Sequence, residues 1–293
     1  SGPTSPPTSP PTSPPSSSSP PTSSPTLPPI EIVGDLCNQI LPPGVYTAVT
    51  TCSLACALEL DGLGDANAEW IFRCGAAFAV AAGASVFFTD DAGSPDNVLW
   101  DIGAATAAGA GSAMIGNLIT VGAISLGGGS WTGTLTTGAT ATVGVGSTVI
   151  GNLIAFGVIT IAANVETCDL TSTMGPITLG ADAKTGAITT SGAFPITLGA
   201  SAESGDLTST SGAITLGANA KCATLVAGGA VTLGAGAIVS GTVSAAGAYT
   251  KGANASGPDN LTVPTSLDDD GALTALGACN DAIADARALL ITI

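Results

Sequence analysis

The chain has 293 residues, of which 45% are hydrophobic, 9% are charged and none is histidine, and its formal net charge is −16. An acidic chain repels phosphate backbones, so we expect no nucleic-acid partner, and the lack of histidine removes the commonest general base and most zinc sites. Since no apolar run reaches about 18 residues, we also expect no membrane span; enzymatic activity, a bound metal and a cofactor are likewise not predicted.

Residues 1–29 form an arm rich in proline, serine and threonine, with no apolar periodicity. This composition favours an extended, polyproline-type segment that builds no core. In secreted proteins such tracts carry O-linked sugars; the alternative is an unmodified flexible linker. The first candidate O-glycosylation sites are Thr4, Ser5, Thr8, Ser9, Thr12 and Ser13.

Seven cysteines are present, and four of them fall within residues 30–106, the predicted first coils of the folded region. This clustering predicts disulfides that cap one end of the fold, and disulfides indicate an extracellular protein, either secreted or held at a surface. Cys52 and Cys56 resemble half a zinc site, but no second pair has the required spacing. An odd count leaves one thiol free or paired between molecules. The disulfide candidates are Cys37, Cys52, Cys56, Cys74, Cys168, Cys222 and Cys279.

Residues 107–252 are repetitive, and the phrase Ile-Thr-Leu-Gly-Ala recurs at 177–181, 196–200 and 214–218. Aligned on their central residue, the repeats are spaced by 17 to 19 residues. A period of about 18 with alternating apolar and polar residues predicts a β-solenoid with one repeat per coil. The aligned central residues are Ser125, Thr142, Thr160, Thr178, Thr197, Thr215, Thr232 and Thr250.

Neighbouring residues of a strand point to opposite faces, so Ile177 and Leu179 are predicted to point inward and Thr178 outward. With coils about 4.8 Å apart, the eight hydroxyls form a straight file about 35 Å long. The glycine after each leucine, such as Gly180, is expected to allow a tight turn, while alanines fill the interior. A second repeated register is apolar: Leu118, Leu135, Leu153, Leu170, Ile188, Leu207, Leu225 and Val243.

The hydroxyl file has two interpretations. Threonine suits an exposed strand position and identical neighbours stack well, which makes the file a structural feature. Alternatively, a flat grid of hydroxyl and methyl groups orders water and docks on ice or on a sugar chain. A second outward file mixes hydroxyl and aliphatic residues and is less regular: Ile119, Thr136, Ile154, Thr171, Thr189, Thr208, Val226 and Ser244.

Four separated motifs follow one another in the first half of the chain: LPPGVYTA (41–48), LELDGLGDANAEWIFRCG (58–75), NVLWDIG (97–103) and IGNLIT (115–120). Their order and spacing resemble the ice-binding-protein-like domain of microbes, over about residues 33–165. The resemblance implies an irregular right-handed β-helix with a long α-helix packed along it. Members of this family bind ice, serve as ice adhesins or have no known role.

The two ends of the chain depart from the family pattern, which places a leading segment and a helix before the first motif. Here a helix is predicted at the other end, because residues 268–293 combine an amphipathic pattern with a final apolar strand. Either the domain is circularly permuted and this helix packs on its own solenoid, or the helix and strand complete the next molecule head to tail. The assembly residues would be Leu289, Leu290, Ile291 and Ile293.

Residues 253–267 form a predicted loop with N-glycosylation sequons at Asn254 and Asn260. Trp70, Trp100 and Trp131 are expected in the core, with a sugar-stacking platform as the alternative.

These features together predict an all-β, right-handed β-solenoid with about 18 residues per coil, a C-terminal α-helix and an extended N-terminal arm. We expect an extracellular, glycosylated structural protein that stacks head to tail on other copies of itself into a filament or matrix fibre. The alternative is an ice-binding protein that acts through the hydroxyl file. The predicted partners are therefore other copies and covalent glycans, with ice or a polysaccharide in the alternative.

Overall fold

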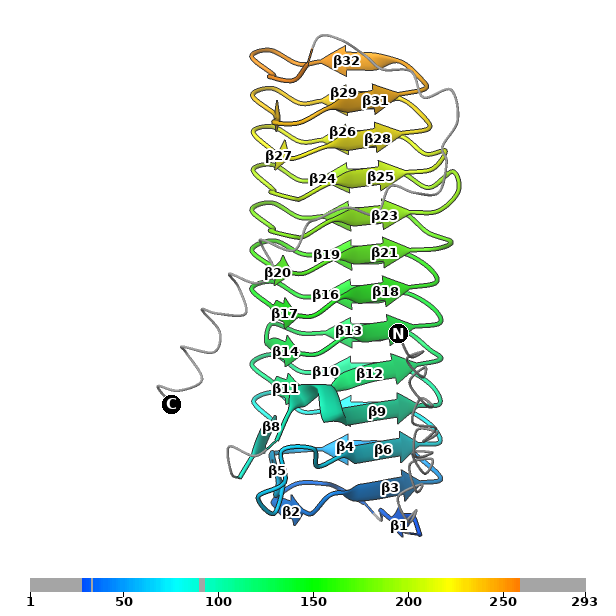
Figure 1. Cartoon of the computed structure of the whole chain (residues 1–293), viewed down its shortest axis with the longest axis vertical. Coiled ribbons are helices and arrows are strands. Elements are labelled where there is room, and N and C mark those ends of the chain that lie inside the picture. Colours follow the sequence, from blue (N-terminus) through cyan, green and yellow to red (C-terminus); the bar gives the residue numbers. More distant parts are fainter. Residues whose placement is uncertain (1–27, 33, 90–92, 259–293) are drawn as a thin grey trace, which may run out of the picture.

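The computed structural model describes residues 28–32, 34–89 and 93–258, and this part of the chain is a column of stacked coils (Figure 1). All its strand pairs are parallel, and the 3-10 helix η1 (Pro95–Asn97) is the sole helix among the described residues. The predicted all-β solenoid is confirmed. In each coil the chain runs through three sheets in turn, which we call faces 1, 2 and 3.

Face 1 is a sheet of twelve strands that runs along the whole column. Its strands, in spatial order, are β1 (Ile30–Glu31), β3 (Gly44–Ala48), β6 (Trp70–Cys74), β9 (Val98–Ile102), β12 (Asn117–Thr120), β15 (Leu135–Thr137), β18 (Leu153–Ala155), β21 (Leu170–Ser172), β23 (Ile188–Thr190), β25 (Leu207–Ser209), β28 (Leu225–Ala227) and β31 (Val243–Ala245).

Face 2 is a sheet of eleven strands, and it carries the predicted hydroxyl file. Its strands are β4 (Cys52–Leu54), β7 (Phe78–Val80), β10 (Thr106–Ala108), β13 (Ile124–Leu126), β16 (Ala141–Val143), β19 (Ile159–Ile161), β22 (Ile177–Leu179), β24 (Ile196–Leu198), β26 (Ile214–Leu216), β29 (Val231–Leu233) and β32 (Tyr249–Lys251).

Face 3 holds a sheet of seven strands, continued by isolated bridges and by a pair of short strands. The seven strands are β2 (Gln39–Leu41), β5 (Ala57–Leu60), β8 (Ser85–Phe88), β11 (Ala113–Ile115), β14 (Ser130–Thr132), β17 (Thr148–Ile150) and β20 (Glu166–Thr167), and the pair is β27 (Lys221–Cys222) with β30 (Ile238–Val239).

The interior is built from residues that alternate with outward ones along each strand. Ile177 and Leu179 are buried while Thr178 between them is exposed, as predicted. The second repeated register, from Leu118 to Val243, is likewise buried and pairs coil to coil. Alanines fill the narrow edge beside face 3, where Ala183 and its equivalents in the next coils have no exposed surface. Each coil therefore rests its apolar side chains on those of the coil below.

The glycines after the leucines have a different role from the one predicted. Gly180 and Gly199 do not adopt the left-handed conformation; instead, a Cβ on Gly199 would lie 2.5 Å from the carbonyl carbon of Gly180 in the coil below. The left-handed turn comes two residues later, at Asp182 and Ser201, both with φ of 56°. The glycines therefore allow coils to approach each other rather than the chain to turn.

Buried hydroxyls close the corner between faces 1 and 2. The Ser172 Oγ lies 2.7 and 2.8 Å from the carbonyl oxygens of Gly157 and Gly175 and can donate its one proton to either of them. The Ser209 hydroxyl donates to the carbonyl of Phe194 at 2.9 Å. Both serines are fully buried. They satisfy backbone groups that a turn would otherwise leave without partners.

The N-terminal end of the column is held by disulfides and aromatic rings. Cys37 bonds to Cys56 and Cys52 bonds to Cys74, which confirms the predicted cap. Inside these coils the rings of Phe72 and Trp100 stack with centroids 4.2 Å apart. Cys168 is also disulfide-bonded, whereas Cys222 is a free, buried thiol. Among the described cysteines, Cys222 is thus the free thiol.

Several predicted features lie outside the described residues and stay predictions. They are the C-terminal helix and strand at 268–293 with Leu289, Leu290, Ile291 and Ile293, the second sequon at Asn260, Cys279, and the arm with Thr4, Ser5, Thr8, Ser9, Thr12 and Ser13.

Candidate functional site

The candidate site is the outward file of face 2, which the strand register places in one straight row. Ser125 pairs with Thr142, and the pairing continues through each successive coil without a bulge. The row then passes from Thr197 to Thr250 in the same way. Strands in a sheet lie about 4.8 Å apart, so the eight hydroxyls span about 35 Å.

The sequence spacing of the file varies, yet its spacing in space does not. Between faces 1 and 2 the chain needs three residues to connect β18 to β19 but five to connect β23 to β24. The five connecting residues, from Ser191 to Pro195, lie at the corner, and the strands on both sides keep their three-residue register. Insertions are therefore absorbed at the corner, and the file stays regular.

Small, uncharged residues surround the file. The position after each strand is glycine or alanine, as at Gly180 and Ala162, and the position before it is apolar at Val158 and Pro176. Between residues 123 and 235, no charged residue occurs on the strands of face 2 or within two residues of them. Lys251 is next to Thr250, the last residue of the file. Between residues 123 and 235 the face therefore presents hydroxyls and methyl groups without charge.

The hydroxyls of the file are available to an outside partner. Six of the eight residues are exposed and two, Thr197 and Thr215, are half-buried. Within the described residues, no side-chain hydrogen bond joins these hydroxyls to another protein group. Each hydroxyl can both donate and accept a hydrogen bond. A row of this kind can hold a matching row of water molecules or of sugar hydroxyls.

The second outward file, on face 1, is less uniform, as predicted. Ile119 and Ile154 interrupt its hydroxyls, and both side chains are exposed. In the first coils the same file holds Arg73 and Asp101, which form an ion pair with Nε and Oδ2 3.9 Å apart. Both charged side chains are more than half exposed, so this pair contributes little to stability.

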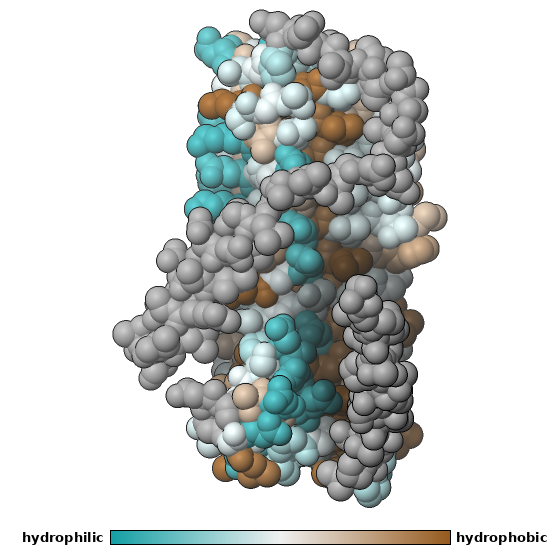
Figure 2. Space-filling model, in the orientation of Figure 1, coloured by the Kyte–Doolittle hydropathy of each residue, from teal (hydrophilic) through white to brown (hydrophobic). Residues whose placement is uncertain are grey.

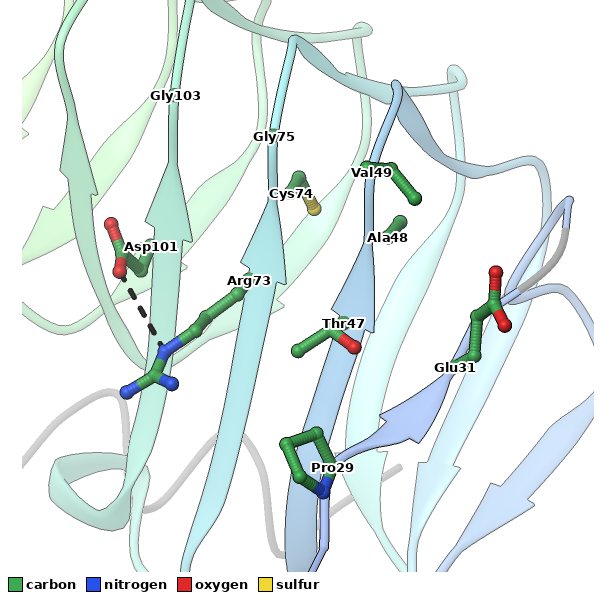
Figure 3. Close-up of a pocket in the computed structure, with 10 residues that line it drawn as sticks. All are labelled: Pro29, Glu31, Thr47, Ala48, Val49, Arg73, Cys74, Gly75, Asp101 and Gly103. Atoms are coloured by element: carbon green, nitrogen blue, oxygen red, sulfur yellow. Dashed lines mark ion pairs between the residues drawn. The ribbon is translucent and has the colours of Figure 1, made fainter.

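A shallow hollow of about 640 Å³ lies over these first coils of face 1 (Figure 3). Figure 3 shows Arg73 directed toward Asp101, with Thr47 and Glu31 on the neighbouring strands. Residues that follow the strands, such as Gly75, also line it. The hollow brings together one cation and two carboxylates without a buried polar group, so its geometry indicates no specific ligand.

Face 3 carries a row of alternating charge in the later coils. Glu166, Lys184, Glu203 and Lys221 follow one another from coil to coil. Lys184 Nζ lies 3.5 Å from Glu166 Oε1, and Lys221 Nζ lies 2.7 Å from Glu203 Oε1. The hydrogen bond from Lys221 lowers the pKa of the Glu203 carboxyl. In Figure 2, hydrophilic residues gather along the left edge of the upper coils, where Figure 1 places β27. Face 3 is thus the charged side of these coils, opposite in character to face 2.

The tryptophans are core residues, and the sugar-platform alternative is wrong. Trp70, Trp100 and Trp131 are fully buried, and each indole N–H donates to a backbone carbonyl. No aromatic platform is formed by these residues. Asn254, the first sequon, is exposed and adopts a left-handed turn with φ of 58°; its glycosylation stays a prediction. The described residues contain no group of three or more side chains placed to hold a metal ion, and no helix among them is long and apolar enough to cross a membrane.

Comparisons with known proteins agree with the resemblance noted in the sequence. Residues 20–138 match the model of the Ice-binding-like family. An ice-binding protein of Nostoc sp. (strain HG1) is 35% identical over 92 residues, which is 31% of this chain and 34% of that protein. The chain thus spans about a third of the length of this relative.

Two solved structures match parts of this chain, both with TM-scores below 0.5. The first is a domain of an ice-binding protein of Shewanella frigidimarina, with a TM-score of 0.33 and 23% identity over 40% of this chain and 46% of that one. The second is an ice-binding protein from an Antarctic bacterium of the Flavobacteriaceae, with a TM-score of 0.32 and 18% identity over 80% of this chain and 82% of that one. The family match ends at residue 138, so it includes Ser125 but not the seven other residues of the file.

Proposed function

From the similarity of residues 20–138 to the ice-binding-like family, we propose that the protein binds ice, and that face 2 is the surface that meets it. The observation that carries this proposal is the unbroken row of hydroxyls on an uncharged face. The proposed role is that of a binding protein, with no reaction to catalyse.

The physical argument concerns water at the surface. Each hydroxyl of the file holds a water molecule by a hydrogen bond, and the neighbouring methyl groups disfavour water arrangements other than this row. Because the backbone fixes the positions of the hydroxyls, the waters are ordered before ice arrives. A surface that is already ordered loses less entropy on binding than a mobile one. Charged side chains would hold their own hydration shells, and face 2 has none in its central coils.

The fibre predicted from the sequence is not favoured. The relatives that match this chain are ice-binding proteins, and the residues predicted to join one copy to the next lie outside the described part of the chain. We further propose that the protein acts outside the cell, because two disulfides hold its first coils and such bonds persist in oxidising surroundings.

The test is the freezing behaviour of solutions of the purified chain. Thermal hysteresis and inhibition of ice recrystallisation are measured for the wild type, for Thr178→Tyr on face 2 and for Thr189→Tyr on face 1. Both positions are central, outward and within a hydroxyl-bearing file, so the two variants are matched. We expect the first variant to lose most of the activity and the second to keep it.

Either of two results would refute the assignment. Full activity in the Thr178→Tyr variant would exclude face 2, and loss in the Thr189→Tyr variant alone would place the site on face 1. A wild type with no activity in either assay would reject ice binding altogether. Circular dichroism of each variant confirms that the fold is retained.

A further inference from the structure

Cys168 forms a disulfide whose partner follows from the other cysteines of the chain. Cys168 is disulfide-bonded. The two bonds that hold the N-terminal end use four of the seven cysteines, and Cys222 is a free thiol. The cysteine that is left is Cys279, which lies outside the described residues.

The position of Cys168 in its coil is unusual for this column. It lies at the bend that precedes face 1, two residues before the apolar register that runs from Leu118 to Val243. In the other coils of this register the same position holds a glycine or an alanine: Gly116, Gly133, Gly151, Gly186, Gly205, Ala223 and Gly241. Only the coil of Cys168 therefore carries a side chain longer than a methyl group at this bend, and the repeat itself does not require one.

Cys168 and Cys222 are buried in different ways. Their exposed fractions are 2% and 4%, but Cys222 belongs to the contiguous cluster of buried residues that fills the column, and Cys168 does not. Cys168 lies instead at the corner between β20 of face 3 and β21 of face 1. Burial raises the pKa of the Cys222 thiol to about 12, so Cys222 holds little of the thiolate that disulfide exchange requires. Of these two cysteines, Cys168 is the one placed to bond to a segment outside the column.

The chain beyond the last coil is long enough to return to this corner. Five successive pairings on face 3 lead from Ser256 to Glu166, which is two residues before Cys168. At about 4.8 Å for each pairing, the return distance is about 24 Å. The sequence between Pro258 and Cys279 has about 20 residues, which span about 30 Å as a helix and about 65 Å as an extended chain. The same chain can therefore close the bond in either conformation.

We propose that Cys168 and Cys279 of the same chain form a disulfide, which fastens the C-terminal segment to the corner between faces 3 and 1. In this reaction the two thiols give up two protons and two electrons to a disulfide oxidant, such as oxidised glutathione; one S–S bond forms between the cysteines and the oxidant becomes two thiols. The corner is the one that does not border face 2, so the attachment point lies away from the hydroxyl file. The proposal does not depend on ice binding, and it favours attachment of the C-terminal segment to its own column over the head-to-tail arrangement.

Disulfide mapping of the full chain tests the pairing. The protein is made in an oxidising host, unfolded without reductant, treated with iodoacetamide to block free thiols, and cut by a protease that cleaves before aspartate. Cys168 and Cys279 then fall in separate fragments, residues 101–168 and 270–280, and each fragment has one cysteine. We expect these two fragments to be linked, to separate on reduction, and Cys222 alone to carry the alkyl group. On a denaturing gel without reductant the chain should run as a monomer.

Variants test whether the two cysteines act as one unit. The bond would close a loop of about 110 residues that contains the coils from Thr178 to Thr250, and closing a long loop restricts the unfolded chain. We expect Cys168→Ser and Cys279→Ser to lower the denaturation midpoint by the same amount, and the double variant to lower it no further, because each loses the same single bond. The matched control, Cys222→Ala, should keep the linked fragments.

Four results would overturn the inference. Alkylation of Cys279 in the unreduced protein would show that it forms no bond. Linkage of Cys279 to a cysteine other than Cys168, or of fragment 101–168 to itself, would show a different pairing. A chain that runs as a dimer or larger species without reductant would show that the bond joins two copies. A double variant that is clearly less stable than either single variant would show that the two cysteines contribute separately.

Discussion

Replacing Gly199 with alanine tests whether glycine beside the hydroxyl file sets the separation of the coils. A Cβ at this position would lie 2.5 Å from the carbonyl carbon and 2.6 Å from the carbonyl oxygen of Gly180. Non-bonded carbon atoms pack at about 3.5–4.0 Å, so the added methyl overlaps the neighbouring backbone by about 1 Å. The obstacle is main chain, which cannot rotate away as a side chain would.

Relief of this overlap requires the two coils to move apart. The movement would lengthen the hydrogen bond from Gly199 N to Leu179 O, now 2.8 Å. Overpacking of this kind lowers the free energy of unfolding by about 1–3 kcal/mol. Alanine also reduces the conformational entropy of the unfolded chain, which offsets about 0.4–1 kcal/mol of this loss. We therefore expect Gly199→Ala to lower the free energy of unfolding by about 1–2 kcal/mol.

The matched control is Gly146→Asn. Gly146 has a φ of 69°, and a Cβ there would meet no atom within 4 Å. Asn164 and Asn219 occupy the equivalent position in other coils with φ of 56° and 58°. Asparagine tolerates this conformation, so the change is expected to stay within about 0.5 kcal/mol.

Chemical denaturation followed by circular dichroism measures both variants against the wild type. The reasoning fails if Gly199→Ala unfolds at the same denaturant concentration as the wild type, or if Gly146→Asn is as destabilised as Gly199→Ala. Thermal hysteresis of the folded Gly199→Ala protein gives a second readout, because a wider coil spacing disturbs the file between Thr178 and Thr197. We expect its activity to fall.

Three further predictions use other parts of the fold. Ala107 is exposed and pairs with Ser125, so Ala107→Thr adds a rung and should raise thermal hysteresis, whereas Val226→Thr on face 1 should not. Removing the bond between Cys52 and Cys74 by serine substitution should lower the free energy of unfolding by about 3 kcal/mol for its 22-residue separation; an unchanged denaturation midpoint would contradict this. Burial raises the pKa of the Cys222 thiol to about 12, so iodoacetamide at neutral pH should modify it only after unfolding, and mass spectrometry of the native protein should find it unmodified.

The sequence was sufficient to predict the solenoid and the position of the hydroxyl file. The reason is that each coil must pair with the next, so a repeat in sequence becomes a repeat in space. The alternation around Thr178 then fixed which side chains face outward. The cysteine cluster correctly located the capped end, because Cys37, Cys52, Cys56 and Cys74 lie too close in sequence to serve distant coils.

Other features depend on contacts that a repeat pattern does not reveal. The glycines after the leucines were expected at turns, but the close neighbour of Gly199 is Gly180, 19 residues earlier in the chain. The true turn residues vary in type, as at Asp182 and Ser201, so they form no visible column. A signal did exist for the corner hydroxyls: serine or threonine recurs two residues after a buried leucine or isoleucine, as at Ser172 after Leu170.

At the corner between faces 1 and 2 the number of residues per coil varies, while the spacing of the hydroxyl file stays the same. The longer connection from Ser191 to Pro195 changes the corner, but the strands on either side stay aligned with those of the neighbouring coil. The spacing of the hydroxyls along the file is therefore set by backbone hydrogen bonding between coils and not by the number of residues per coil. During evolution, small insertions at this corner would be tolerated, and duplication of a coil would add one hydroxyl to the file without altering the spacing between hydroxyls.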